Sequence, residues 1–235
     1  MESTKKDFQP LAVYLGGVTG KRVVIHALPN FLSYWNAIRK PNSYDLIFDD
    51  AHFTDYRATK LGYEVLVKVP GNISYSLIVA QGSPITDPHD LVGKRIATMG
   101  APSMGAMRLQ SLYPNPLRQP NIVEVSNPDK ALALLLGKKR VRAAILPTPY
   151  VSRRRNHGDK FRVLISTEPI PHMAISAAPS VDPLIRTAIR NALINANNTP
   201  AGERMLEELG LARLEPADTA AYRGQARILE KYWGY

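Results

Sequence analysis

The sequence has no cysteine among its 235 residues. Disulfide bonds, thiolate metal sites and a cysteine nucleophile are therefore excluded. No apolar run approaches the roughly 18 residues that a membrane-spanning helix needs. The first residues, MESTKKDFQP, are polar and charged, unlike a signal peptide. If the protein is exported, we expect its leader to lie outside this sequence.

Motifs of the common cofactor and metal enzymes are also missing. The chain contains no phosphate-binding P-loop, dinucleotide-binding glycine fingerprint or HExxH zinc motif. Asp49, Asp50 and His52 follow a strand, but no further group of metal ligands accompanies them. We interpret these three residues as a polar turn that caps a helix starting near Thr54. Contact of Asp49 or Asp50 with a polar ligand stays open, and we expect no metal and no cofactor.

Basic residues are in excess. Lys and Arg number 30 against 20 Asp and Glu, a formal net charge of +10, which implies attraction to anions. The clusters at 138–140 and 153–155 are interpreted as solvated faces. No aromatic residues interleave with them, which argues against nucleic-acid binding. An anionic membrane surface or an acidic protein partner remains open.

Strand-like and helix-like stretches alternate along the chain. Apolar stretches of strand length occupy 22–28, 44–48, 63–69, 95–99, 121–125, 142–146 and 161–167. Stretches with helical spacing occupy 7–20, 30–40, 54–62, 103–112, 128–139, 182–196, 200–210 and 220–233. This order predicts an α/β protein with parallel or mixed sheets flanked by helices.

Two extended segments predict a division into two lobes. The crossings, which we place at 77–82 and 168–174, would make one lobe from both chain ends and insert the other between them. A cleft between two lobes is usually there to close on a ligand.

The segment GAPSMG follows a strand and opens a helix. The backbone N–H groups at 103–105 would then face the cleft and offer an anion site, although Ser103 could serve only as the helix cap. The segment also resembles a nucleophile elbow, with Asp159 and His172 as partners for Ser103. No oxyanion segment precedes it, so a hydrolase is the least favoured interpretation.

Aromatic and methionine side chains accompany these loops. The set comprises Phe31, Tyr34, Trp35, Phe48, Tyr75, Met99, Met104, Met107 and Met173. For any single member, a place in the core is the better prediction. Met104 and Met173 differ, because both stand in loops where we expect the cleft.

Several segments together resemble a known family. They are FQPLAVYLGGVTGKRV, SYDLIFDDAHFTDYRA, YSLIVAQGSPITDPHDLVGKRIA, KALALLLGKKRVRAAI and TEPIPHMAIS. In this order they resemble the phosphonate/phosphite class of periplasmic substrate-binding proteins over nearly the whole chain. A glycine-containing strand that opens the fold of that family is not found ahead of the helix at 7–15.

The resemblance implies a two-lobed type II binding fold in the periplasm, with mixed sheets and two crossover strands as the hinge. Lobe one would comprise 1–79 and 174–235, and lobe two 80–173. Such proteins are not enzymes; they capture a small-molecule ligand and deliver it to a membrane transport component, a permease or other inner-membrane partner. We expect a monomer.

The ligand positions of the family depart from its pattern here. Its Ser-Thr-Ser-Gly loop matches Pro102-Ser103-Met104-Gly105, its first tyrosine falls on Asp49, and its crossover tyrosine falls on Ile73, with Tyr75 two residues on and on the same face. A histidine position is Asn127, and two acidic positions are Pro149 and Met173. The predicted ligand-binding set is Asp49, Asp50, His52, Ile73, Tyr75, Pro102, Ser103, Met104, Gly105, Asn127, Pro149, Tyr150 and Met173.

These departures predict a change of ligand. Losing each hydrogen bond to a phosphonate dianion would cost on the order of 1–3 kcal/mol, whereas Met, Pro and Ile favour apolar contact at roughly 25 cal/mol per Å². We therefore expect a larger, more apolar ligand, such as a lipid or sterol-like molecule, oriented by Asp49, Asp50, Ser103 or Asn127. The alternatives are a phosphonate, phosphite or other small oxyanion, and a sensory ligand-binding module.

Overall fold

The computed structural model describes residues 2–137 and 141–233 and divides into two compact units. Unit 1 comprises the described residues up to Pro29, Ser33–Gly71 and Pro171–Glu230. Unit 2 comprises Asn30–Leu32, Asn72–Ile170 and the described residues from Lys231 on. Strands β3 (Asn72–Ile73) and β9 (Ile170–Pro171), where the chain passes from one unit to the other, form a small two-stranded sheet.

Two short segments fall on the other side of the boundaries that the sequence predicts. Residues 72–79, placed in lobe one by the prediction, include most of β4 (Tyr75–Ala80), which pairs on one side with β7 and on the other with β8 inside the sheet of unit 2. Residues 171–173 belong to unit 1. A strand with two hydrogen-bonded neighbours is tied to its sheet, so the unit boundary precedes β4.

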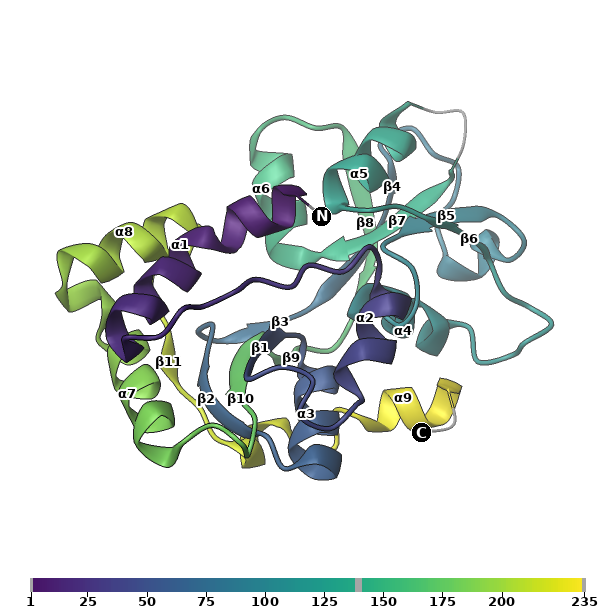
Figure 1. Cartoon of the computed structure of the whole chain (residues 1–235). Coiled ribbons are helices and arrows are strands. Elements are labelled where there is room, and N and C mark those ends of the chain that lie inside the picture. The colour runs from purple at the N-terminus through teal and green to yellow at the C-terminus, as the bar shows by residue number, and fades with distance from the viewer. Residues whose placement is uncertain (1, 138–140, 234–235) are drawn as a thin grey trace. The chain divides into compact units, whose positions relative to one another are not determined.

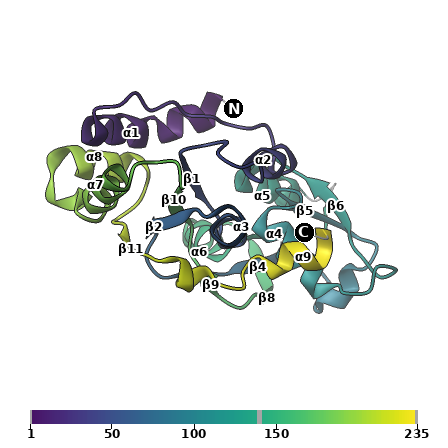
Figure 2. The ribbon, with the colours of Figure 1, turned by 60° about the horizontal axis from the view of Figure 1, so that its bottom comes forward.

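Unit 1 contains a four-stranded sheet of antiparallel pairs, in the order β1 (Leu46–Asp49), β10 (Ala174–Ala177), β2 (Glu64–Lys68) and β11 (Glu215–Pro216). Helices α1 (Glu2–Thr19), α7 (Pro183–Ile194) and α8 (Pro200–Glu208) pack together (Figures 1 and 2). One apolar core joins them to the sheet through residues that include Leu15, Leu66, Ile175, Leu193 and Leu206. Burial of this face is the main stabilising contribution in the unit.

Helix α3 (Ala51–Leu61) covers the opposite face of that sheet. Successive strand residues point to opposite faces, so Ile175 faces the core of α1, α7 and α8 while Ser176 faces Arg57 of α3. Helix α3 ends where the sequence predicts, at Gly62, whose φ of 71° is the left-handed cap that glycine adopts without strain. Helix α2 (Phe31–Ile38) adds Trp35, which stacks on Phe53 of α3.

Unit 2 contains a five-stranded mixed sheet, with strands β6 (Asn121–Glu124), β5 (Arg95–Thr98), β7 (Ala143–Pro147), β4 and β8 (Phe161–Ser166) in that order. Strands β5, β6 and β7 run parallel, while β4 runs antiparallel to β7 and β8. Helices α5 (Pro128–Leu136) and α6 (Thr148–Asn156) share a core with Ala97 on one face. Helix α4 (Met104–Leu112) lies against the other face, since Thr98, the next residue of β5, adjoins its Gly105.

The prediction of mixed sheets flanked by helices is confirmed, but several details differ from the prediction. The helix expected to start near Thr54 begins at Ala51. Residues 22–28 pair with no described strand, although Val23 packs on the core of unit 1. Helix α6 was not predicted. The predicted C-terminal helix is divided into the 3-10 turn Thr219–Tyr222 and α9 (Arg227–Trp233). The basic cluster at 138–140 lies outside the described residues. Within the described chain, no helix has the length and apolar character to cross a membrane.

Candidate functional site

Three helix N-termini share one edge of the sheet in unit 2. Parallel strands β5, β6 and β7 lead into α4, α5 and α6 respectively, so all three helices begin at the carboxyl edge of these strands. This edge is where open α/β sheets bind ligands. Of the predicted residues, it brings together Ser103 at α4, Asn127 at α5, and Pro149 with Tyr150 at α6.

The turn into α4 has few polar side chains but presents backbone N–H donors at the start of the helix. Gly100 has a φ of 78°, a left-handed conformation that turns the chain after β5. Ser103 Oγ then accepts a hydrogen bond of 3.3 Å from the N–H of Ala106 and caps the helix. The N–H groups of Met104 and Gly105 precede the first intrahelical bond and have no acceptor within the helix. Together with the positive end of the helix dipole, they can bind an anion.

Two side chains adjoin this first turn. A Cβ atom added to Gly105 would lie 3.5 Å from Thr98 Oγ1 and 3.5 Å from the ring of Tyr75. Thr98 is fully buried, and its hydroxyl has no hydrogen-bond partner among the described residues. An unsatisfied buried hydroxyl is costly and rare, so it is a candidate ligand contact. Thr98 was not among the residues predicted from the sequence, although its place at the end of the strand before GAPSMG could have indicated it.

A second polar group lies on the other face of the sheet, beside α6. Ser76 shares its face with Ile78 of the α5–α6 core. Its hydroxyl is 2.9 Å from Thr148 Oγ1 and 2.8 Å from Ser166 Oγ, and Ser74 Oγ donates to Thr148 Oγ1 at 2.9 Å. These hydroxyls satisfy one another at the start of α6, so they form a self-contained chain.

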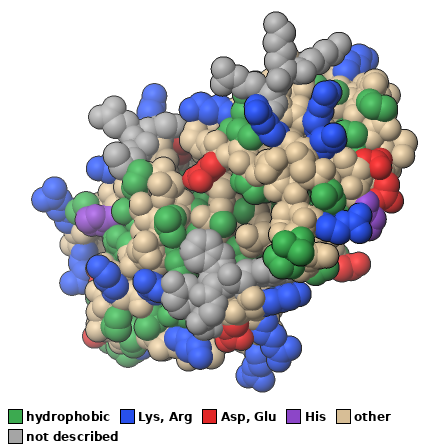
Figure 3. Space-filling view, turned by 90° about the vertical axis from the view of Figure 1, so that its right-hand side faces the viewer, with side chains coloured by type: hydrophobic (Ala, Val, Ile, Leu, Met, Phe, Trp, Pro, Cys, Tyr) green, Lys and Arg blue, Asp and Glu red, His purple; other side chains and the backbone are tan. Residues whose placement is uncertain are grey.

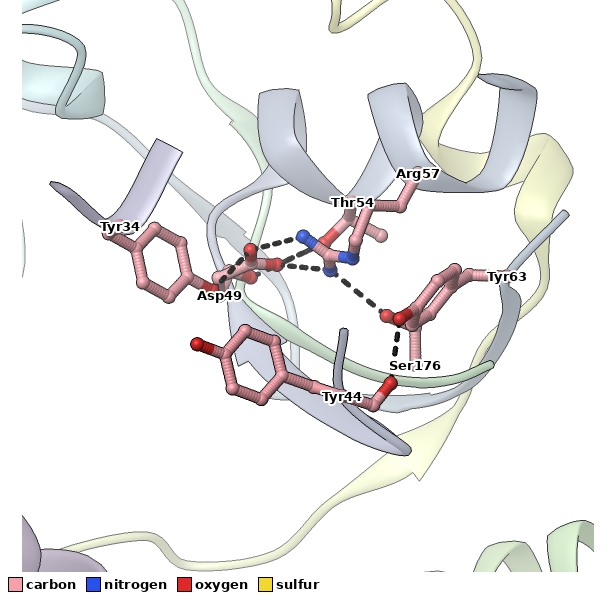
Figure 4. A network of polar contacts seen from close by, with 7 residues as sticks. All are labelled: Tyr34, Tyr44, Asp49, Thr54, Arg57, Tyr63 and Ser176. Carbon is pink, nitrogen blue, oxygen red and sulfur yellow. Dashed lines mark hydrogen bonds and ion pairs between the residues drawn. The ribbon is translucent and has the colours of Figure 1, made fainter. Parts of the chain in front are cut away.

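Asp49 is the centre of a buried network in unit 1 (Figure 4). Arg57 donates to both carboxylate oxygens, at 2.5 and 2.7 Å, and Tyr34 and Thr54 donate to them at 2.7 and 3.0 Å. Arg57 also donates to Ser176 at 3.0 Å. A carboxylate accepts about four hydrogen bonds, so these contacts saturate Asp49. With these contacts in place, Asp49 has no free acceptor site with which to orient a ligand, unlike the sequence-based prediction.

The charges in this network stabilise each other. Burial raises the pKa of Tyr34 well above its usual value, and the neighbouring Asp49 carboxylate raises it further. Burial alone would lower the pKa of Arg57, but the bidentate contact with Asp49 leaves it raised. Both groups hold their protons throughout the physiological range, so the network is a permanent structural element.

The other predicted residues of unit 1 are also placed by internal contacts. Asp50 stands at the N-cap of α3. His52 is fully buried, with its ring 3.8 Å from that of Phe53. The Met173 carbonyl accepts from the N–H of Val69 at 2.9 Å. Among the residues described, no group of three or more His, Asp or Glu could hold a metal ion.

The remaining predicted residues of unit 2 divide between buried and exposed positions. Ile73, Pro102 and Met104 are buried. The exposed Asn127 accepts from the N–H of Lys130 at 2.9 Å, and Pro149 is exposed nearby on α6.

Tyr150 donates to Asp129 at 2.7 Å. Burial, and then this carboxylate, raise the pKa of Tyr150 to about 12.

The proposed partners of Ser103 in a hydrolase have other contacts. Asp159 accepts from Arg154 Nε at 2.7 Å beyond the C-terminal end of α6, the end opposite to the shared edge. His172 Nδ1 accepts from the N–H of Met173 at 2.8 Å. Ser103 itself accepts from its own helix. The contacts described therefore contain no nucleophile–base–acid relay.

Comparison with known proteins identifies the family. The sequence matches the family described as ABC transporter, phosphonate, periplasmic substrate-binding protein over residues 1–222. No match was found among curated protein sequences. The chain is similar in structure to a binding-protein component of an ABC phosphonate transporter from Pseudomonas aeruginosa, with 14% identity, a TM-score of 0.79, and coverage of 98% of this chain and 82% of that one.

Two further solved structures are similar. PhnD1 of Prochlorococcus marinus in complex with methylphosphonate is 12% identical, with a TM-score of 0.79 and coverage of 98% and 93% of the two chains. A Xanthomonas citri protein bound to ATP is 17% identical, with a TM-score of 0.75 and coverage of 98% and 94%. At these identities the structural similarity shows the fold, and the family match adds the lineage. The chain belongs to the periplasmic substrate-binding proteins of phosphonate ABC transporters and has their two-lobed type II fold.

Proposed function

We propose that this protein captures a small tetrahedral oxyanion, a phosphonate or phosphite, for a membrane permease. The proposed site is the first turn of α4, with the N–H groups of Met104 and Gly105 and the hydroxyl of Thr98 as donors. The observation that carries the proposal is the fully buried Thr98 Oγ1 without a partner beside that turn. An oxyanion would satisfy this hydroxyl and complement the helix dipole.

The apolar alternative, a lipid or sterol-like ligand, has less support. It depended on apolar side chains such as Met104 facing the ligand, but Met104 is only 1% exposed. Its surface is already removed from water, so a ligand would gain little hydrophobic stabilisation from it.

The proposed mechanism is closure of the two units on the ligand by rotation at the paired strands β3 and β9. A ligand that contacts both units would favour the closed form by its difference in affinity between open and closed states. We propose a monomer that delivers its ligand to a permease and has no catalytic activity. A sensory role on the same fold would differ only in the partner that reads the closed state, so the genes beside it would distinguish the two.

Binding measurements with Thr98→Val test the proposed site. Valine keeps the shape of threonine but loses the hydroxyl, so methylphosphonate affinity should fall about 5- to 150-fold, as expected for a lost hydrogen bond to a charged ligand. The unliganded variant should unfold at the same or a higher temperature, because an unsatisfied group has been removed. Isothermal titration calorimetry and thermal unfolding provide the two measurements.

The control is Thr86→Val, because Thr86 is exposed in a loop of the same unit. It should leave the affinity unchanged. The calorimetric panel should include phosphite, sulfate and a lysophospholipid. Binding of the lipid with no response to any oxyanion would overturn the proposal and restore the apolar ligand.

A further inference from the structure

Arg108, in the second turn of α4, forms no ion pair within 4 Å in the described part of the chain. It is partly buried, and its Nε is buried without a hydrogen-bond partner. Arg57 and Arg186 also have an unpartnered Nε, but each of them forms an ion pair, with Asp49 and Glu64 respectively. A partly desolvated guanidinium with neither kind of contact is unusual, since buried charges are normally paired. Arg108 therefore requires an explanation beyond packing.

Helix geometry directs Arg108 toward the proposed site. It follows Met104 by four residues and Gly105 by three, so it lies on the same face of α4 as the first turn. Long side chains in a helix lean back toward the N-terminus, and for Arg108 this is the direction of the turn that carries the N–H groups of Met104 and Gly105. Tyr75, whose ring adjoins Gly105, also lies close enough to Arg108 to influence its pKa.

The electrostatic surroundings leave Arg108 largely uncompensated. Burial lowers its pKa, and the opposing influences come from Tyr75 and Glu168. Glu168 is exposed to solvent and forms no ion pair with Arg108 within 4 Å in the described part of the chain. The positive charge of Arg108 therefore adds to the positive end of the α4 dipole.

We propose that Arg108 recognises the charge of the ligand and selects a dianionic tetrahedral group over a monoanionic one. This inference depends on the proposed oxyanion site at α4. The planar guanidinium would donate to two terminal oxygens of a phosphonate dianion, as arginine does with carboxylates and phosphates. The backbone N–H groups and Thr98 hold the ligand in place, and Arg108 adds the preference for the second negative charge.

Arg108→Gln tests this role through charge selectivity. Methylphosphonate binding is measured by calorimetry at one pH below and one pH above its second ionisation. The wild-type protein should bind the dianion more tightly than the monoanion. In the variant, the dianion should lose about 10- to 100-fold in affinity, the range for a lost charge-assisted hydrogen bond, while the monoanion loses much less. Arg108→Lys, which keeps the charge but not the two-pronged donor, should fall between them.

Two further variants make the result specific. Arg155→Gln removes the same charge from an exposed position on α6 and should leave the dianion preference unchanged. Glu168→Gln removes the exposed acidic neighbour of Arg108 and should tighten dianion binding by roughly 1.5- to 5-fold, the range for an exposed charge pair. Glu168→Gln also gives a result if Arg108→Gln does not fold.

The outcomes separate the two proposals. If the wild-type protein binds no oxyanion, the proposed function fails and the role of Arg108 fails with it. If the wild-type protein binds methylphosphonate and Thr98→Val weakens it, but Arg108→Gln keeps the preference for the dianion, only the inference about Arg108 is overturned. Lower thermal stability of Arg108→Gln with unchanged selectivity would assign the residue a structural role.

Discussion

The network around Asp49 shows that the identity of a residue does not by itself predict whether it contacts a ligand or another side chain. A carboxylate at a strand end suggests ligand contact, and the sequence analysis predicted one. Arg57, which donates to both oxygens of this carboxylate, is eight positions away on the next helix. Thr54 and Arg57 are three apart on one helical face directly after Asp49, and this spacing was the available signal. Complementary charges on either side of a strand–helix turn therefore indicate an internal ion pair rather than a ligand contact.

Asp49→Asn should be among the most damaging single changes in unit 1. It leaves the buried Arg57 without a counter-charge, which typically costs about 3–5 kcal/mol of unfolding free energy. Urea unfolding measures this cost. Glu64→Gln is the control, because it breaks the more exposed pair with Arg186 and should cost less than about 1 kcal/mol. Equal costs for the two variants would contradict the structural role of Asp49.

At the scale of elements, periodicity predicted most of the order of strands and helices, and its failures have physical causes. Helix α6 (TPYVSRRRN) was missed because Val151 is its only buried side chain, too little for an apolar stripe. Residues 22–28 have strand composition, but composition does not supply a neighbouring strand, and without one no ladder forms. Thr98 and Arg108 were missed because burial and unmet hydrogen bonds are properties of the fold.

Local packing predicts opposite effects of alanine at two helical glycines, Gly202 in α8 and Gly17 in α1. A Cβ at Gly202 would lie 2.1 Å from the carbonyl oxygen of Ala196, a backbone atom that cannot move aside easily. Gly202→Ala should therefore destabilise unit 1 by about 1–3 kcal/mol, as overpacking does. At Gly17 of α1 a Cβ would meet nothing within 4 Å. Gly17→Ala should stabilise by about 0.5–1 kcal/mol.

Thermal and urea unfolding of both glycine variants, each with circular dichroism to verify helix content, measure these effects. A stabilising Gly202→Ala would mean that the approach of α8 to the 3-10 turn Ala196–Asn198 is looser than the structure indicates.

For the whole molecule, the family resemblance predicted architecture and location better than it predicted the ligand. Fold and lineage depend on the order of many segments, which survives divergence. The ligand depends on a few contacts, and a methionine in the matching loop suggests an apolar site until its burial is known. The net charge of +10 is a sum over the chain, and Lys and Arg are scattered over the face shown in Figure 3.

Hinge closure makes a prediction for the whole molecule. If the two units close on a ligand, saturating methylphosphonate should reduce the radius of gyration measured by small-angle X-ray scattering. Thr98→Val at the same ligand concentration should show a smaller change, because less of the protein is occupied. An unchanged radius with saturated wild-type protein would contradict closure while leaving the binding site intact.

A β-bulge decides which hydroxyls meet beside α6. Strand β8 pairs Val163 with Ile78 but Ile165 with Leu77, so Leu164 is an extra residue in the ladder. If Leu164 instead paired with Leu77 in a regular ladder, Ser76 would oppose Ile165 rather than Ser166, and the contact between the two serine hydroxyls would be lost. The polar chain thus depends on the register of β8 as well as on its side chains. In divergent relatives, a single-residue deletion at Leu164 would remove the bulge and leave Ser166 opposite Ser76, so the contact would persist.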